Sequence, residues 1–313
     1  MKLLAGAACT ALLAGTLVAC AGSGDDDGRT SVVASFYPAA FLAERIGGES
    51  VSVETLTSPG AEAHDLELTA KQVVDVNEAD VVVYLTHFQE AVDHAVEDAD
   101  RDSATTVDLA AGVEEIADEE GHDHDHDHDE DHEGHDHDHG GIDPHVWLDP
   151  ANMVTAAEGV RDALVEADPD QASTFEANAD ELIAELEALD ADFTKGLASC
   201  ERTEFVTSHA AFGHLAHAYD LTQVPISGID PQSEPTTAAL AEITEQVKEH
   251  GLTTVFTERL ASSALAETVA RETGAATAVL DPIEGLSDET ADEDYVSLMR
   301  QNLEALVKAN GCQ

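Results

Sequence analysis

Short apolar runs rich in β-branched residues alternate with stretches of helical periodicity along most of this chain. In the first half, strand-like runs at 31–37, 51–56, 80–85 and 105–109 are separated by helical stretches at 38–46, 69–77 and 88–98. Strands that alternate with helices of this length form parallel βαβ units, because parallel neighbours need a long crossover connection. The alternation therefore predicts an α/β lobe over residues 31–168.

The same alternation returns in the second half. Strands are expected at 204–207, 222–226, 253–257 and 276–280, and helices at 210–219, 236–250, 262–273 and 292–310. These elements predict a second α/β lobe over residues 200–313, again with a mainly parallel sheet flanked by helices.

A long amphipathic stretch lies between the two halves, after a helical stretch at 152–166. Residues 170–197 carry Leu182, Leu186, Leu189 and Phe193 at helical spacing, and Pro169 marks the start. At 1.5 Å per residue, such a helix would cross most of a small protein. The sequence therefore predicts two α/β lobes joined by one long helix within 169–199.

The net charge of the chain limits the classes of molecule that it can bind. Sixty-six acidic residues against 13 Lys and Arg give a formal net charge of −53. Nucleic-acid binding needs a basic face that neutralises phosphates, so we exclude it. The acidity attracts cations, although a solvated acidic surface is an equally simple reading of most of it.

The N-terminus predicts the compartment. Lys2 precedes an apolar stretch at 3–18, which is short for a membrane span and typical of a secretory signal peptide over 1–19. The sequence LVAC at 17–20 resembles a bacterial lipobox, in which Cys20 becomes the lipidated first residue; the alternative is an ordinary cleavage site. Residues 20–30 then form a flexible tether. We expect a lipoprotein anchored to the outer face of the cell membrane.

The cysteine count predicts one disulfide. Cys9 leaves with the signal peptide and Cys20 carries lipid, so Cys200 and Cys312 remain. Outside the cell two such cysteines are expected to pair. The bridge would tie the end of the chain to the start of the second lobe, and neither sulfur would remain as a metal ligand.

A tract at 121–140 reads GHDHDHDHDEDHEGHDHDHG. Short histidine-rich tracts are typical of metal binding, and imidazole suits zinc, copper, nickel and cobalt. Without apolar periodicity, we expect a flexible accessory loop at 119–141 that collects ions weakly, or else a tolerated acidic loop. Its histidines are His122, His124, His126, His128, His132, His135, His137 and His139.

Four residues outside this tract occupy positions suited to a binding site. His64, His209 and Asp281 lie at or just beyond the carboxyl ends of predicted strands, where open α/β sheets bind ligands, and His145 follows the histidine-rich tract. Three imidazoles and one carboxylate make a tetrahedral zinc set. Asp281 alone could instead be a turn residue, since proline follows it. His87 is a further candidate ligand.

Several motifs together resemble one protein family. They are GAEAHDLELTAKQ, DPHVWLDPANM, TSHAAFGHLA, GIDPQSEPT, FTERLASSALAETVARETGA and VLDPIEGL. In this order they are similar to the metal-binding solute-binding proteins of bacterial ABC importers, in the zinc (ZnuA-like) group. The resemblance covers the chain from Ser31 onward. It implies two α/β lobes linked by a long helix, and one metal ion held in the cleft.

The resemblance also implies the ligands and the partners. It makes His64, His145, His209 and Asp281 the metal ligands. Manganese-binding relatives have a carboxylate where His209 stands, and a histidine there suits zinc. The implied function is capture of Zn²⁺ by a monomeric, non-enzymatic protein that delivers it to an ABC permease with its ATPase. The alternatives are a surface zinc store or adhesin and a zinc-dependent hydrolase, although the chain lacks an HExxH motif.

Overall fold

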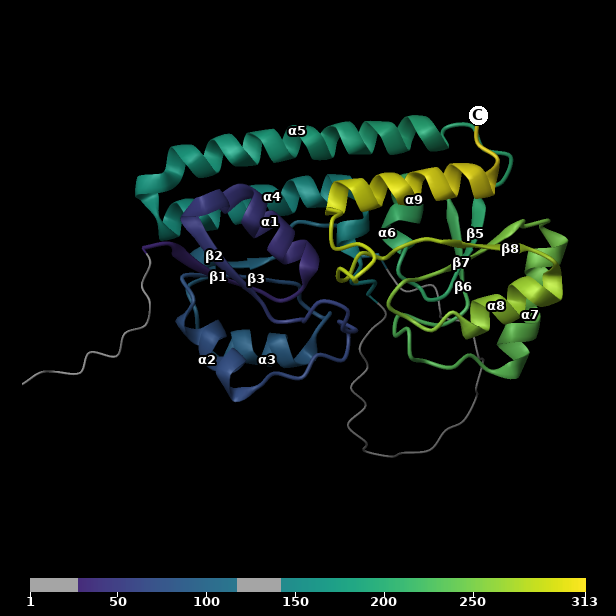
Figure 1. Cartoon of the computed structure of the whole chain (residues 1–313), viewed down its shortest axis with the longest axis horizontal. Coiled ribbons are helices and arrows are strands. Elements are labelled where there is room, and N and C mark those ends of the chain that lie inside the picture. Colours follow the sequence, from purple (N-terminus) through teal and green to yellow (C-terminus); the bar gives the residue numbers. More distant parts are fainter. Residues whose placement is uncertain (1–27, 117–141) are drawn as a thin grey trace, which may run out of the picture.

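The computed structural model describes residues 28–116 and 142–313. In the first lobe, four parallel strands lie in the order β2-β1-β3-β4. Their bounds are β1 (Thr30–Ala34), β2 (Val51–Thr55), β3 (Val81–Tyr84) and β4 (Thr106–Asp108). The helices of this lobe are α1 (Tyr37–Gly47), α2 (Ala70–Glu78), α3 (Glu90–Asp98) and α4 (Pro150–Ala167). Figure 1 shows α2 and α3 on one face of the sheet, with α1 and α4 on the other.

The second lobe repeats this topology with the strand order β6-β5-β7-β8, again entirely parallel. Its strands are β5 (Glu204–Thr207), β6 (Thr222–Pro225), β7 (Thr254–Thr257) and β8 (Ala276–Val279). Its helices are α6 (Gly213–Ala218), α7 (Thr237–Glu249), α8 (Ala264–Thr273) and α9 (Tyr295–Asn310). In each sheet the first strand has a neighbour on both sides. The chain passes first to one neighbour and then crosses to the other, and this reversal of strand order creates a crevice at the carboxyl ends of the strands.

One helix, α5 (Ala172–Leu197), joins the lobes. It lies across both of them, above α4 and α9 (Figure 1). Its buried side chains repeat every three or four residues along one face: Phe175, Ala179, Leu182, Leu186, Leu189, Phe193 and Leu197. This stripe extends the main hydrophobic core from one lobe into the other. The predicted fold class, two parallel α/β lobes and a long linking helix, is confirmed.

The predicted helices and strands are present. Two helices begin later than predicted, because the residue before each of them makes a hydrogen bond to another part of the chain. α3 begins at Glu90 rather than Phe88, because the buried Gln89 side chain donates to Thr57 Oγ1 and the Ala63 carbonyl. α6 begins at Gly213, because the preceding Phe212 N donates to the Gln223 side chain. Both departures occur beside the crevice between the lobes.

Cys200 and Cys312 form a disulfide, with an S–S distance of 1.98 Å. The bridge joins the segment after α5 to the end of α9, at the end of the second lobe that carries the C-terminus (Figure 1). Cys20 lies outside the described residues. Among the described residues, no helix is both long and apolar enough to cross a membrane.

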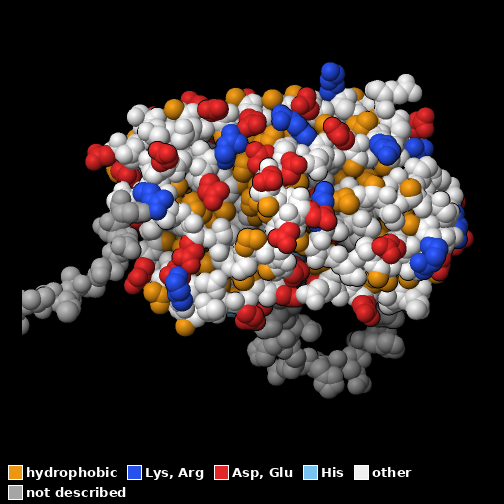
Figure 2. Space-filling model, viewed as in Figure 1, with side chains coloured by type: hydrophobic (Ala, Val, Ile, Leu, Met, Phe, Trp, Pro, Cys, Tyr) orange, Lys and Arg blue, Asp and Glu red, His pale blue; other side chains and the backbone are white. Residues whose placement is uncertain are grey.

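Acidic side chains are spread over the surface. In Figure 2, carboxylates appear across both lobes on the face shown, with basic side chains between them. Much of the acidity on this face is therefore solvated, in agreement with the interpretation of the composition as a solvated acidic surface.

Candidate metal centre

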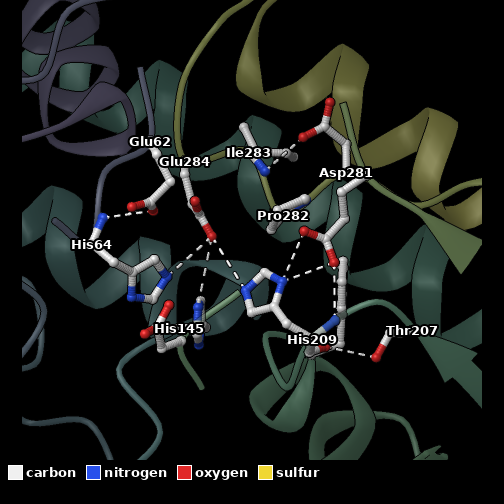
Figure 3. Close-up of polar contacts among 12 residues, drawn as sticks. Glu62, His64, His145, Thr207, His209, Asp281, Pro282, Ile283 and Glu284 are labelled. Carbon is white, nitrogen blue, oxygen red and sulfur yellow. Dashed lines mark hydrogen bonds and ion pairs between the residues drawn. The ribbon is translucent and has the colours of Figure 1, made fainter. Parts of the chain in front are cut away.

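Four side chains from different parts of the chain converge between the lobes (Figure 3). They are those of His64, His145, His209 and Glu284, and each offers one ligand atom within 4.8 Å of the other three. His64 follows β2, and His145 precedes the short 3-10 helix η3 (Val146–Leu148). His209 follows β5 and Glu284 follows β8, so each lobe supplies two ligand atoms.

His145 is fully buried and is held by a neighbour in sequence. Its Nδ1 lies 2.7 Å from Asp143 Oδ1, and the same oxygen accepts from the His145 backbone N–H at 2.9 Å. Burial lowers the pKa of His145, although the Asp143 carboxylate opposes this. The ring is therefore neutral, and a carboxylate on Nδ1 leaves Nε2 as the free lone pair.

His209 is also buried, but its support comes from another strand. Both oxygens of Glu258, just after β7, lie 2.8 Å from His209 Nδ1. Burial by itself would lower the pKa of His209, but Glu258 and Glu284 outweigh it and raise the pKa to about 10. A metal ion that binds Nε2 must displace the proton that these carboxylates favour.

His64 lies on the loop between β2 and α2 and has the lightest support. Its backbone N–H donates to Glu62 Oε1 at 2.8 Å, and its ring packs edge-on against Phe88, with 4.7 Å between ring centroids. Its side chain is 9% exposed, against 0% for His145 and 1% for His209. Among the three rings, that of His64 is thus the closest to solvent.

Glu284 brings a buried carboxylate to the three rings. Its Oε1 lies 3.4 Å from Nε2 of His64, 3.8 Å from that of His145 and 3.5 Å from that of His209. Burial by itself would raise the pKa of Glu284, but His209 and His64 hold it well below its usual range. The carboxylate is therefore ionised and aimed at the point where the imidazoles meet.

These four inward-facing atoms share a further property. His64 Nε2, His145 Nε2, His209 Nε2 and Glu284 Oε1 are all buried without a hydrogen-bond partner. An unsatisfied buried polar atom costs about 1–3 kcal/mol, so four of them at one point need a common partner. Three imidazole nitrogens and one carboxylate oxygen at this spacing fit a tetrahedral cation such as Zn²⁺.

The structure corrects the expected carboxylate. Asp281 does not face the histidines: its Oδ1 accepts from the Ile283 N–H at 2.9 Å, and its Oδ2 lies 3.0 Å from Arg259 Nε. In Figure 3 its carboxylate points to the far side of the turn from the rings. Asp281 is thus a turn residue, which was the alternative interpretation of its sequence position. Glu284 faces the histidines in its place.

The other histidines among residues 28–116 and 142–313 lie outside the centre. His87 is exposed, and its backbone N–H donates to Asp93 Oδ2, so it does not join the cluster. His214 is buried, with Nε2 3.0 Å from the Asp143 carbonyl oxygen, which supports the Asp143 segment. The predicted histidine-rich loop at 119–141 lies entirely outside the described residues.

Sequence reasoning missed Glu284 as a candidate ligand, and Asp143 and Glu258 as the partners of two histidine rings. Glu284 stands three residues after Asp281 in VLDPIEGL, within a motif that the resemblance already contained. Asp143 could have been found, because an acidic residue two positions before a candidate ligand can reach its ring. Glu258 gave no such signal, since 49 residues separate it from His209.

The comparisons with known proteins identify the family of this chain. Residues 32–309 match the family described as "ZnuA: Zinc-uptake complex component A periplasmic". The chain belongs to this family. It is 38% identical to the high-affinity zinc uptake system protein ZnuA of Bacillus subtilis, over 91% of this chain and 89% of that protein. Since the family consists of zinc-uptake components, the prediction of a binding protein rather than an enzyme is confirmed.

Streptococcal members of the family are equally similar. The chain is 40% identical to the zinc-binding lipoprotein AdcA of Streptococcus pneumoniae over 93% of this chain, but it spans only 58% of that relative's length. The crystal structure of the Zn(II)-bound ZnuA-like domain of AdcA superposes with a TM-score of 0.73 at 35% identity, covering 90% of this chain and 99% of that one.

A more distant neighbour has a second described activity. The laminin-binding protein Lmb of Streptococcus agalactiae matches with a TM-score of 0.76 at 27% identity, over 90% of this chain and 99% of that one. It is described as a bifunctional protein with adhesin and metal transporting activity.

Proposed function

We propose that this protein captures Zn²⁺ outside the cytoplasm and delivers it to an ABC permease and its ATPase for high-affinity zinc uptake. His64, His145, His209 and Glu284 are the proposed ligands. The observation that carries the proposal is the convergence of four buried ligand atoms, none with a hydrogen-bond partner. A cation at their meeting point would satisfy all four at once.

The composition of the site favours zinc over harder ions. Imidazole nitrogens suit zinc, whereas magnesium, calcium and manganese prefer oxygen ligands. Carboxylates on the Nδ1 atoms of His145 and His209 raise ligand basicity and fix ring orientation, as is common at zinc centres. Because the imidazoles must bind in their neutral form, zinc affinity should fall as the pH is lowered.

The position of the site offers a way to signal loading. Two ligands come from each lobe, so a bound ion ties the lobes together. Trp147 adds a direct link, because its Nε1 donates to the Pro282 carbonyl at 2.7 Å. Its own carbonyl accepts from Tyr295 Oη at 2.6 Å. A permease can distinguish loaded from empty protein if these contacts differ between the two states.

Two parts of the proposal concern residues outside the described ranges. Cys20 would carry the lipid that anchors the protein to the outer face of the membrane. The histidines between 121 and 140 would act as an accessory collector of zinc. Neither is needed for tight binding at the centre, so both can be removed in the decisive experiment.

That experiment measures zinc affinity by competition with a chromophoric chelator for the full protein and five variants. His64→Ala, His209→Ala and Glu284→Gln should abolish tight binding, while deletion of 121–140 and Cys20→Ser should preserve it. The proposal is wrong if the deletion removes all tight binding or if the ligand variants retain it. Zinc at 100 times its Kd should also stabilise the parent by about 2.7 kcal/mol.

The alternatives predict different results. A surface store or adhesin, which the likeness to Lmb favours, would bind several ions per chain and keep its function without a permease. A zinc hydrolase needs an open ligand position for water, and the Glu284 carboxylate would fill that position. Ester or peptide turnover that depends on zinc and on His145 would revive the hydrolase.

A further inference from the structure

The turn that carries Glu284 has a strained backbone. Ile283 has φ of 57°, in the left-handed region that β-branched residues rarely adopt. Its side chain is fully buried, so the turn cannot relax outward without exposing it. A strained residue directly before a proposed ligand suggests that neighbouring contacts enforce the conformation.

The Asp281 side chain contacts the strained residue, Ile283, directly. Its Oδ1 accepts from the Ile283 N–H at 2.9 Å, which closes an Asx-type turn across Pro282. The backbone of Asp281 is fixed from α9, since its N–H donates to Asn302 Oδ1 at 2.8 Å and its carbonyl accepts from Asn302 Nδ2 at 2.7 Å. The backbone of Asp281 is therefore fixed by Asn302, and the Asp281 side chain in turn fixes the backbone N–H of Ile283.

Arg259 fixes the other oxygen of the same carboxylate. Arg259 Nε lies 3.0 Å from Asp281 Oδ2, and the Asp281 side chain is 8% exposed. Asp281 and Glu284 line one small pocket together with Glu62 and Glu258. This ion pair turns the Asp281 carboxylate toward Arg259 rather than toward the histidines.

We propose that Asp281 is a positioning residue for zinc binding, which holds the 281–284 turn so that Glu284 reaches the ion, and that Arg259 holds Asp281 in that role. This inference rests on the proposed function, because it takes Glu284 as a ligand. Asp281 then affects zinc only through the geometry of Glu284. Its oxygen acceptor is essential, and its negative charge is not.

The test compares Asp281→Ala with Asp281→Asn, because asparagine retains an oxygen that can accept from Ile283 N–H. Asp281→Ala should weaken zinc binding about 10–100-fold, the usual cost of losing a supporting partner. Asp281→Asn should stay within about threefold of the parent, since the hydrogen bond is retained. Arg259→Gln also removes the ion pair but keeps the Asp281 oxygen, so it should behave like Asp281→Asn. Glu289→Gln, which removes the exposed second partner of Arg259, is the matched control and should have no effect.

Cobalt substitution separates positioning from a general loss of stability. The visible absorption of Co²⁺ reports its coordination, so Asp281→Ala should shift the spectrum toward that of Glu284→Gln, and Asp281→Asn should keep the parent spectrum. Thermal unfolding of each metal-free variant measures folding separately. A variant that unfolds earlier but keeps the parent spectrum and zinc affinity would show a purely structural role and overturn the inference.

The remaining outcomes are also decisive. Equal losses for Asp281→Asn and Asp281→Ala would mean that the charge of Asp281, or its direct ligation, matters, and the positioning role would be wrong. A zinc affinity of Asp281→Ala equal to that of the parent would also show that the positioning role is wrong. If Glu284→Gln binds zinc as the parent does, the proposed ligand set fails instead, which distinguishes the two failures.

Discussion

The two lobes hold their proposed ligands by different means. In the first lobe, the supporting acceptors precede the ligands by two residues: Glu62 binds the backbone of His64, and Asp143 binds the ring of His145. In the second lobe, His209 is held by Glu258, 49 residues away. The Asp281 backbone, at the start of the Glu284 turn, is held by Asn302 on α9.

This difference shows two ways to build the same kind of site. Local support needs only a short motif, and the motif can sit on a loop. Long-range support needs two strands that end at the same edge of a sheet, which β5 and β7 provide because they are neighbours. The second lobe therefore depends on its tertiary structure for ligand geometry, and the first lobe depends on it less.

The largest expected effect comes from removing one ligand in each lobe. His145→Ala and His209→Ala should both weaken zinc binding by more than the roughly 100-fold upper cost of losing a supporting partner. Each variant leaves three ligand atoms around the ion. Chelator competition measures the affinities, and His94→Ala, an exposed histidine on α3, is the control. If either lobe's histidine is dispensable, the view of a shared site between the lobes is wrong.

The supporting carboxylates should have the next largest effect. Asp143→Asn and Glu258→Gln should each reduce zinc affinity about 10–100-fold. We expect the larger loss for Glu258→Gln, because both of its oxygens lie 2.8 Å from His209 Nδ1. Calorimetric titration of both variants gives the ranking. A larger loss for Asp143→Asn would reverse the proposed difference between the lobes.

A contact between the lobes should have a smaller effect. Gln232 Nε2 donates to Asp65 Oδ2, next to His64, and both residues are exposed. Gln232→Ala removes this hydrogen bond, so zinc should dissociate faster by less than about tenfold. Stopped-flow mixing with excess chelator measures the rate, and Asp65→Asn should behave similarly. An unchanged rate in both variants would show that the lobes are held together without this contact.

The disulfide should leave zinc affinity unchanged, because the bridge lies at the end of the second lobe that carries the C-terminus (Figure 1). Reduction should instead lower the free energy of unfolding by at most about 5 kcal/mol, since the bridge joins residues 112 positions apart in the sequence. Urea unfolding of the oxidised protein and of Cys200→Ser/Cys312→Ser measures this loss. A weaker zinc affinity in the double variant would mean that the ligand geometry of the second lobe depends on the bridge.

Much of the fold followed from local patterns. The alternation of strands and helices predicted both lobes, and the apolar spacing from Leu182 to Phe193 predicted the linking helix, because these periodicities depend on neighbours a few residues apart. The first residues of α3 and α6 could not be predicted from local patterns. Gln89 and Phe212 leave helical geometry to make contacts that come from other parts of the chain.

The sequence by itself determined the architecture and three histidines suited to zinc, because strand ends and residue chemistry can be read along the chain. Only the tertiary structure decided which carboxylate faces them. Asp281 and Glu284 are three residues apart and both carry a carboxylate, and their directions depend on the left-handed backbone at Ile283 and on Arg259, which follows the end of another strand. Such directions are set by long-range contacts that no local pattern encodes.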